Sequence, residues 1–196
     1  MPFLFKYTIL LLMAWWPIKQ EQSTTDILQA VAEASFKELN AVRQDPKHYA
    51  GKYKLPALLK VPAKHELVWD TTLARLAQQK AEDMARKNYF DHVDKKGKGM
   101  NYYLWQANYP LPHYFSKDAK ANNVESIAAN TQGPQEFIKQ LIIDAGVPSL
   151  GHQKHLLGLN DKDTPTTHVG IGIAYNPRSK YKYYCSILIV PKAENL

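Results

Sequence analysis

Cysteine is almost absent from this chain of 196 residues, which contains only Cys185. A single cysteine excludes internal disulfides, so packing has to supply the stability. It also excludes zinc fingers and iron–sulfur clusters, because both need several thiolates at short spacing. Cys185 lies in an aromatic and β-branched run. We therefore interpret it as a small buried hydrophobic residue and not as a nucleophile.

The chain also lacks a long run of basic residues. Its 25 lysines and arginines exceed the 18 acidic residues by a modest margin, which gives a formal net charge of +7. The densest basic cluster, at residues 95–98, is typical of a solvated loop, so we expect no nucleic-acid partner. With 45% hydrophobic and 22% charged residues, the composition is that of a globular protein, and the length fits one domain.

No apolar run is long enough to span a bilayer alone. The longest, at residues 7–16, follows Lys6 and would rise only about 15 Å as a helix, half of the hydrocarbon thickness. We predict that residues 1–20 are a signal peptide, and that the protein is secreted or lies in the periplasm or cell envelope. The A-x-A cleavage pattern is missing, which leaves an uncleaved N-terminal anchor as the alternative and the only expected membrane contact. Without Lys6 and Lys19, the only charges in this segment, the net charge falls to +5.

Several catalytic motifs are missing. The sequence contains no G-x-S-x-G, no P-loop, no G-x-G-x-x-G and no H-E-x-x-H. Gly170 and Gly172 lie inside a predicted strand, where they cannot cradle a phosphate. Because no serine, histidine and acid are recognisable together with a strained turn, we do not expect covalent catalysis.

Predicted helices occupy the first part of the chain. Apolar residues at helical spacing begin after capping side chains at residues 23–26, and Asp45 and Pro46 stop them. Asp70 is placed to cap a second helix, which ends near Asn88. The predicted helices are those at residues 26–43, 71–88, 100–107, 133–146 and 151–157, and residues 49–64 are interpreted as a loop.

Predicted strands occupy the last part of the chain. Residues 168–175 alternate large apolar with small side chains, and residues 183–190 form their hairpin partner across a turn. The small face, with Gly170 and Gly172, lets a neighbouring element approach the backbone closely. Residues 125–129 are a candidate third strand. Helices followed by an antiparallel sheet predict the α+β class.

Imidazoles and carboxylates are the informative polar side chains. His92 follows the second predicted helix, while His152 and His155 share one face of the short helix because they are three residues apart. Glu125 heads an apolar strand and Asp144 closes an apolar helix, where an unpaired carboxylate would be costly to bury. We therefore expect each acid to have a cationic partner, a hydrogen-bonding partner or a metal. Spacing assigns no role to His155 or to the other histidines.

Several segments, in this order, carry a resemblance to a known family. They are residues 88–92 (NYFDH), 124–128 (VESIA), 151–157 (GHQKHLL) and 168–172 (HVGIG), supported by residues 39–43 and 67–70. Together they resemble the bacterial branch of the CAP superfamily (cysteine-rich secretory proteins, antigen 5 and pathogenesis-related 1), whose domain is also called the SCP domain. The resemblance places this domain at residues 26–192. It implies a three-layer α-β-α sandwich with a small antiparallel sheet.

The resemblance also implies a cleft that holds two histidines and two acids, reported in some members to bind a divalent metal. By position, His92 and His152 match the two histidines, and Glu125 matches the acid of the family's Gly-Glu-Asn motif. Asp144 is assigned as the second acid, as in a subset of bacterial members.

Such a tetrad leaves three interpretations open. Two imidazoles and one or two carboxylates can ligate a divalent metal such as Zn²⁺, so we expect a cleft that binds a metal or a small ligand. The alternative is a metal-dependent hydrolase of esters or peptides, in which Glu125 or Asp144 is the base for a metal-bound water. The four groups could also satisfy one another and only stiffen the cleft.

Two further expectations concern the surroundings of the tetrad. Val124 and Ser126 stand where the family usually has Gly and Asn, so the presentation of Glu125 differs from the usual one. The expected partner is a small ligand or a component of the cell envelope, because a modest positive charge favours encounter with an anionic wall or membrane.

Overall fold

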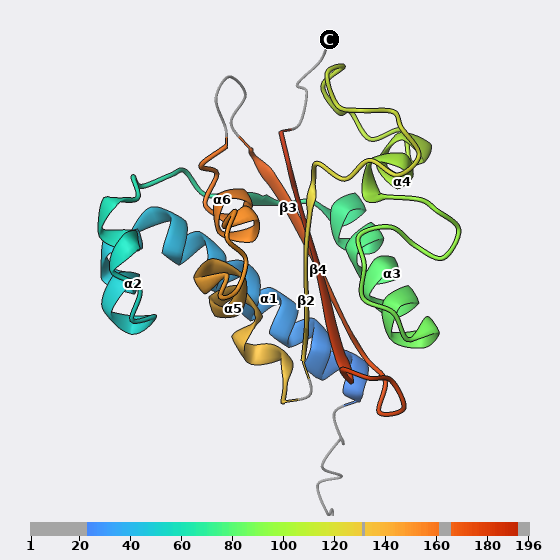
Figure 1. Cartoon of the computed structure of the whole chain (residues 1–196), viewed down its shortest axis with the longest axis horizontal. Helices are drawn as coiled ribbons and strands as arrows, with labels where there is room; N and C mark the ends of the chain where they lie inside the picture. The colour runs from blue at the N-terminus through green and yellow to red at the C-terminus, as the bar shows by residue number, and fades with distance from the viewer. Residues whose placement is uncertain (1–22, 131, 161–165, 192–196) are drawn as a thin grey trace, which may run out of the picture.

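The computed structural model describes residues 23–130, 132–160 and 166–191 (Figure 1). The predicted signal peptide or anchor at residues 1–20 lies outside them. Within the described residues, no helix is both long and apolar enough to cross a membrane.

All of the described helices precede the two long strands that complete the sheet. The described helices are α1 (Thr24–Gln44), α2 (Pro46–Lys52), α3 (Thr71–Lys87), α4 (Met100–Gln106), α5 (Phe137–Ile143) and α6 (Gly151–Leu156), with 3-10 turns η1 (Pro56–Lys60) and η2 (Pro134–Glu136). The strands are β1 (Val68–Trp69), β2 (Glu125–Asn130), β3 (His168–Tyr175) and β4 (Tyr183–Val190). Their order in the sheet is β1-β3-β4-β2, with β1 parallel to β3 and the other pairs antiparallel. The α+β class is therefore confirmed.

Two helix expectations are wrong. Residues 49–64, interpreted as a loop, contain most of α2 and all of η1. Asp45 does stop α1, but its carboxylate also accepts the backbone N–H of His48 at 3.0 Å and thereby caps α2. The helix expected at residues 133–146 is divided into η2 and α5 and ends at Ile143, because Asp144 adopts a left-handed conformation with φ 51°.

The sheet lies between two layers of helices, with α3 and α4 on one side and the remaining helices on the other (Figure 1). The large apolar side chains of β3, Val169, Ile171 and Ile173, pack with those of α1, α5 and α6. The opposite face of β3 lies against α3, where a Cβ added to Gly172 would come within 2.1 Å of the backbone nitrogen of Gln78. Glycine therefore lets α3 rest directly on the strand backbone. The three-layer α-β-α arrangement is confirmed.

Two buried polar side chains tie α1 to the rest of the domain. The amide of Asn40 accepts the backbone N–H of Leu67 at 2.9 Å and donates to its carbonyl at 3.0 Å, just before β1. The guanidinium of Arg43, only 2% exposed, donates to the carbonyl of Leu156 at 2.8 Å. Because Leu156 ends α6, the Arg43 bond ties α6 to α1, while the Asn40 bonds tie the start of β1 to α1.

The close approach of α3 to β3 generates a stability prediction. Gly172→Ala should lower the free energy of unfolding by about 1–3 kcal/mol, because the new methyl group meets helix backbone that cannot move alone. Gly51→Ala in α2 is the matched control, since nothing lies within 4 Å of its added Cβ. It should leave stability unchanged or raise it by up to about 1 kcal/mol. Urea denaturation followed by circular dichroism measures both, and equal stability of the two variants would contradict the packing described.

Buried tyrosines generate a pH prediction. Burial, together with neighbouring carboxylates, raises the pKa of Tyr53, Tyr89 and Tyr109 above the ordinary value of 10.0. Tyr109, for example, donates its hydroxyl to Asp70 at 3.2 Å. A tyrosine whose pKa is higher in the folded than in the unfolded protein contributes its full stabilisation below about pH 10. As the pH rises further, the unfolded chain ionises first and this contribution is lost. The free energy of unfolding should therefore fall from pH 10 upward in urea titrations at pH 8–11, and less steeply for Tyr109→Phe.

Candidate functional site

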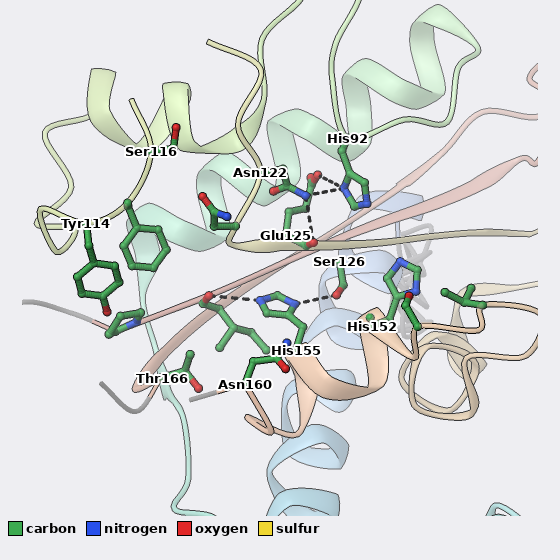
Figure 2. A pocket seen from close by; sticks show the side chains of 17 residues that line it. His92, Tyr114, Ser116, Asn122, Glu125, Ser126, His152, His155, Asn160 and Thr166 are labelled. Atoms are coloured by element: carbon green, nitrogen blue, oxygen red, sulfur yellow. Dashed lines mark hydrogen bonds and ion pairs between the residues drawn. The ribbon is translucent and has the colours of Figure 1, made fainter. Parts of the chain in front are cut away.

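A cavity of about 930 Å³ opens beside β2 and α6 (Figure 2). Three of the four predicted site residues line it, His92, Glu125 and His152. The fourth, Asp144, lies behind His152 and is 5% exposed. The structure therefore brings together residues that are far apart in the sequence.

The first pair in the cavity joins Glu125 to His92. Glu125 begins β2, and its side chain is fully buried, while His92 lies in the loop after α3 with its side chain 37% exposed. The carboxylate Oε2 lies 2.9 Å from Nδ1 of His92, and Oε1 accepts the hydroxyl of Ser186 at 2.8 Å. Both carboxylate oxygens thus have partners, as expected for a buried acid.

Lys80 positions the loop that carries His92. Its ammonium group, on α3, donates to the backbone carbonyls of Asp91 at 2.7 Å and His92 at 3.0 Å. Burial lowers the pKa of Lys80, and the charge of Glu125 acts in the opposite direction. The loop is therefore held to α3 through its main chain, which leaves the imidazole of His92 available to the cavity.

The second pair joins Asp144 to His152. Because Asp144 ends α5 in the left-handed conformation, its carboxylate lies at the start of α6. Oδ1 lies 2.7 Å from Nδ1 of His152, and Oδ2 accepts the backbone N–H groups of His152 at 3.0 Å and Gln153 at 3.3 Å. One buried acid therefore both satisfies the first amides of α6 and orients an imidazole.

The two imidazoles face each other across one part of the cavity. The ring centroids of His92 and His152 are 6.4 Å apart with an interplanar angle of 31°. Each ring directs Nδ1 at its carboxylate, so Nε2, on the far side of the ring, points away from it. Among the described residues, neither Nε2 has a hydrogen-bond partner.

This arrangement differs from a site with four protein ligands. Within residues 23–130, 132–160 and 166–191, no group of three or more His, Cys, Asp or Glu side chains is arranged to hold a metal ion. The carboxylates of Glu125 and Asp144 bind the imidazoles of His92 and His152 instead. Carboxylates that orient histidines are the usual second layer of metal sites. The donor set therefore fits an ion held by two imidazole nitrogens, and the set of four ligands stays a prediction.

Asn122 is a site residue that the sequence did not indicate. Its amide nitrogen lies 2.9 Å from Nδ1 of His92 and donates to the carbonyl of Glu125 at 3.3 Å. Nδ1 cannot donate to Glu125 and accept from Asn122 at once. The amide therefore competes with the carboxylate for this nitrogen, while the buried Oδ1 of Asn122 has no partner among the described residues.

Ser126 and His155 form a third polar contact in the same cavity, which the sequence did not indicate either. The hydroxyl oxygen of Ser126 lies 2.7 Å from Nδ1 of His155. The spacing of His155 three residues after His152 was the available signal, and both residues do line the cavity from α6. Sequence could not show that Ser126, 29 residues earlier, lies opposite.

The chain belongs to the CAP, or cysteine-rich secretory protein, family. The model of that family matches residues 36–188, which contain the sheet up to the last residues of β4 and also every cavity residue discussed above. The resemblance noted from the sequence is thereby confirmed.

Three similar proteins give the comparison its scale. YkwD of Bacillus subtilis (strain 168), described as an uncharacterized protein, is 31% identical over 103 residues, which are 53% of this chain and 33% of YkwD. An extracellular protein containing an SCP domain from Bacillus anthracis str. Ames is 19% identical, with a TM-score of 0.48 over 87% of this chain and 45% of that one. An outer surface protein from Borrelia burgdorferi is 15% identical, with a TM-score of 0.49 over 84% of this chain and 94% of that one. The chain thus spans a third of YkwD and under half of the Bacillus anthracis protein.

Proposed function

We propose that this CAP-domain protein is exported and binds a divalent metal ion, with Zn²⁺ as the best candidate, through Nε2 of His92 and Nε2 of His152. The observation that carries the proposal is the pair of carboxylate-oriented imidazoles 6.4 Å apart at one cavity. Zinc–nitrogen bonds are about 2.0–2.1 Å long, so the two rings would hold one ion by turning both Nε2 atoms toward the space between them. A bound Zn²⁺ would act as a Lewis acid toward a small ligand in the cavity.

The burial and hydrogen bonds of Glu125 and Asp144 favour metal binding over metal-dependent hydrolysis. A general base needs a carboxylate oxygen that is not already held by other hydrogen-bond donors. The side chain of Glu125 is 0% exposed and that of Asp144 2% exposed, and every carboxylate oxygen already accepts a hydrogen bond. Their geometry supports orienting the imidazoles, a role that leaves neither acid placed to activate water.

The location and partner follow from charge and from the N-terminus. The apolar segment at residues 7–16 supports export, and the formal charge of +5 that remains without residues 1–20 favours contact with an anionic envelope. The cavity, of about 930 Å³, is large enough for a small molecule or for one end of a polymer. We therefore propose a small ligand or a cell-envelope component as its partner.

Zinc titration tests the metal site. Calorimetry should show one Zn²⁺ bound per chain, and His92→Ala or His152→Ala should each weaken binding by more than about 100-fold, because each removes one of two nitrogen ligands. Glu125→Gln, which keeps the ligands but loosens the orientation of His92, should weaken it by about 10–100-fold. His65→Ala is the control, since that side chain is exposed and lies outside the cavity lining.

Two results would contradict this proposal. Folded wild-type protein that takes up no Zn²⁺ would remove the metal site, and so would His152→Ala binding zinc as tightly as wild type. Cleavage of a model ester or peptide that a chelator abolishes, and that is lost in His92→Ala, would replace binding by the metal-dependent hydrolase.

A further inference from the structure

The contact between Ser126 and His155 lies apart from the proposed metal ligands, His92 and His152. β2 is an edge strand of the sheet, so side chains from both of its faces can border one cavity. Glu125 contacts His92 near α3, whereas Ser126, the next residue, contacts His155 on α6. Figure 2 shows the hydroxyl of Ser126 directed at the ring of His155, apart from the contact between His92 and Glu125.

The hydrogen bonds of His155 set its tautomer. Its Nε2 lies 3.4 Å from the backbone carbonyl of Ile189, and a carbonyl oxygen can only accept. Nε2 therefore carries the proton, and Nδ1 keeps a lone pair. That lone pair lies 2.7 Å from the oxygen of Ser126 and accepts its hydroxyl proton. A serine that donates to an imidazole held by a third group is the arrangement of an activated nucleophile.

The surroundings suit acyl transfer. Ser126 is 1% exposed yet lines the cavity, so its oxygen is shielded from bulk water but borders the space that a ligand would enter. Asn123 and Asn160 line the same cavity, so two neutral side-chain amides border the space that a ligand would enter. Ser149 also lines the cavity but has no described contact with an imidazole, which makes it a natural control.

We infer that Ser126 and His155 are a nucleophile–base dyad that hydrolyses carboxylic esters. The proton of Ser126 Oγ moves to Nδ1 of His155 while Oγ bonds to the ester carbonyl carbon. The tetrahedral intermediate then releases the alcohol, which takes the proton from His155 as its C–O bond breaks. A water molecule, deprotonated by the same nitrogen, then bonds to the acyl carbon. As the bond from that carbon to Oγ breaks, Nδ1 returns the proton to Ser126 Oγ and the acid is released. One ester and one water thus become one acid and one alcohol.

A fluorophosphonate probe tests the dyad on the full chain. Ser126 Oγ should displace fluoride from phosphorus, and intact mass followed by peptide mapping should find one adduct per chain, located on Ser126. His155→Gln should label about 10²–10⁴-fold more slowly, as expected for loss of a general base. Ser126→Ala should not label, while Ser149→Ala should label like wild type. Zinc titration of Ser126→Ala should match wild type, because His92 and His152 are unchanged.

The outcomes separate this inference from the metal proposal. Folded wild-type protein with no adduct on Ser126, or His155→Gln labelling at the wild-type rate, would overturn the dyad even if zinc binds. Labelling that a chelator prevents would also overturn it, since the step uses no metal. Adduct formation on Ser126 in protein that takes up no zinc would support the dyad and leave only the metal site refuted. Mapping on wild type alone decides the matter if a variant fails to fold.

Discussion

Direct packing of α3 on the backbone of β3 governs where the neighbouring segments lie. Gly170 and Gly172 leave no side chain between the helix and the strand, so the backbones approach to distances at which a Cβ would clash. The end of α3 is thereby fixed relative to the sheet. Lys80, on the same helix, then holds the loop after α3 by its carbonyls, which places His92 beside Glu125. A small-residue face on one strand thus determines one side of the cavity.

The cavity depends equally on how buried charges are satisfied. Glu125 and Asp144 are both almost fully buried, and each is paired with an imidazole and with neutral donors. Charge-assisted hydrogen bonds of this kind are strong enough to fix side-chain orientation in a partly enclosed site. Each acid therefore decides which ring nitrogen faces inward and which faces the cavity. The same interactions that satisfy the buried acids also orient the two imidazoles.

Local patterns predicted those elements whose signals are local. The hairpin at residues 168–175 and 183–190 and the cap at Asp70 follow from alternation and from a side chain that bonds its own helix. The prediction of a loop at residues 49–64 was wrong because Asp45 both ends α1 and caps α2. A residue that stops one helix gives no local sign that it also starts another. The predicted end of α5 was wrong for a related reason. Asp144 ends the helix in a left-handed conformation, and its carboxylate there accepts a hydrogen bond from the backbone of α6.

The sequence by itself determined the class of the fold, the family and the candidate residues, which are His92, Glu125, Asp144 and His152. Strand alternation, helix capping and the order of motifs are all properties that lie along the chain. The contacts between those residues were decided only by the tertiary structure. Whether a carboxylate ligates an ion or orients an imidazole depends on distances between residues that are 33 positions apart, as for Glu125 and His92. The contact of Ser126 with His155 likewise arises where an edge strand meets a short helix, a meeting produced by packing and not by any local pattern.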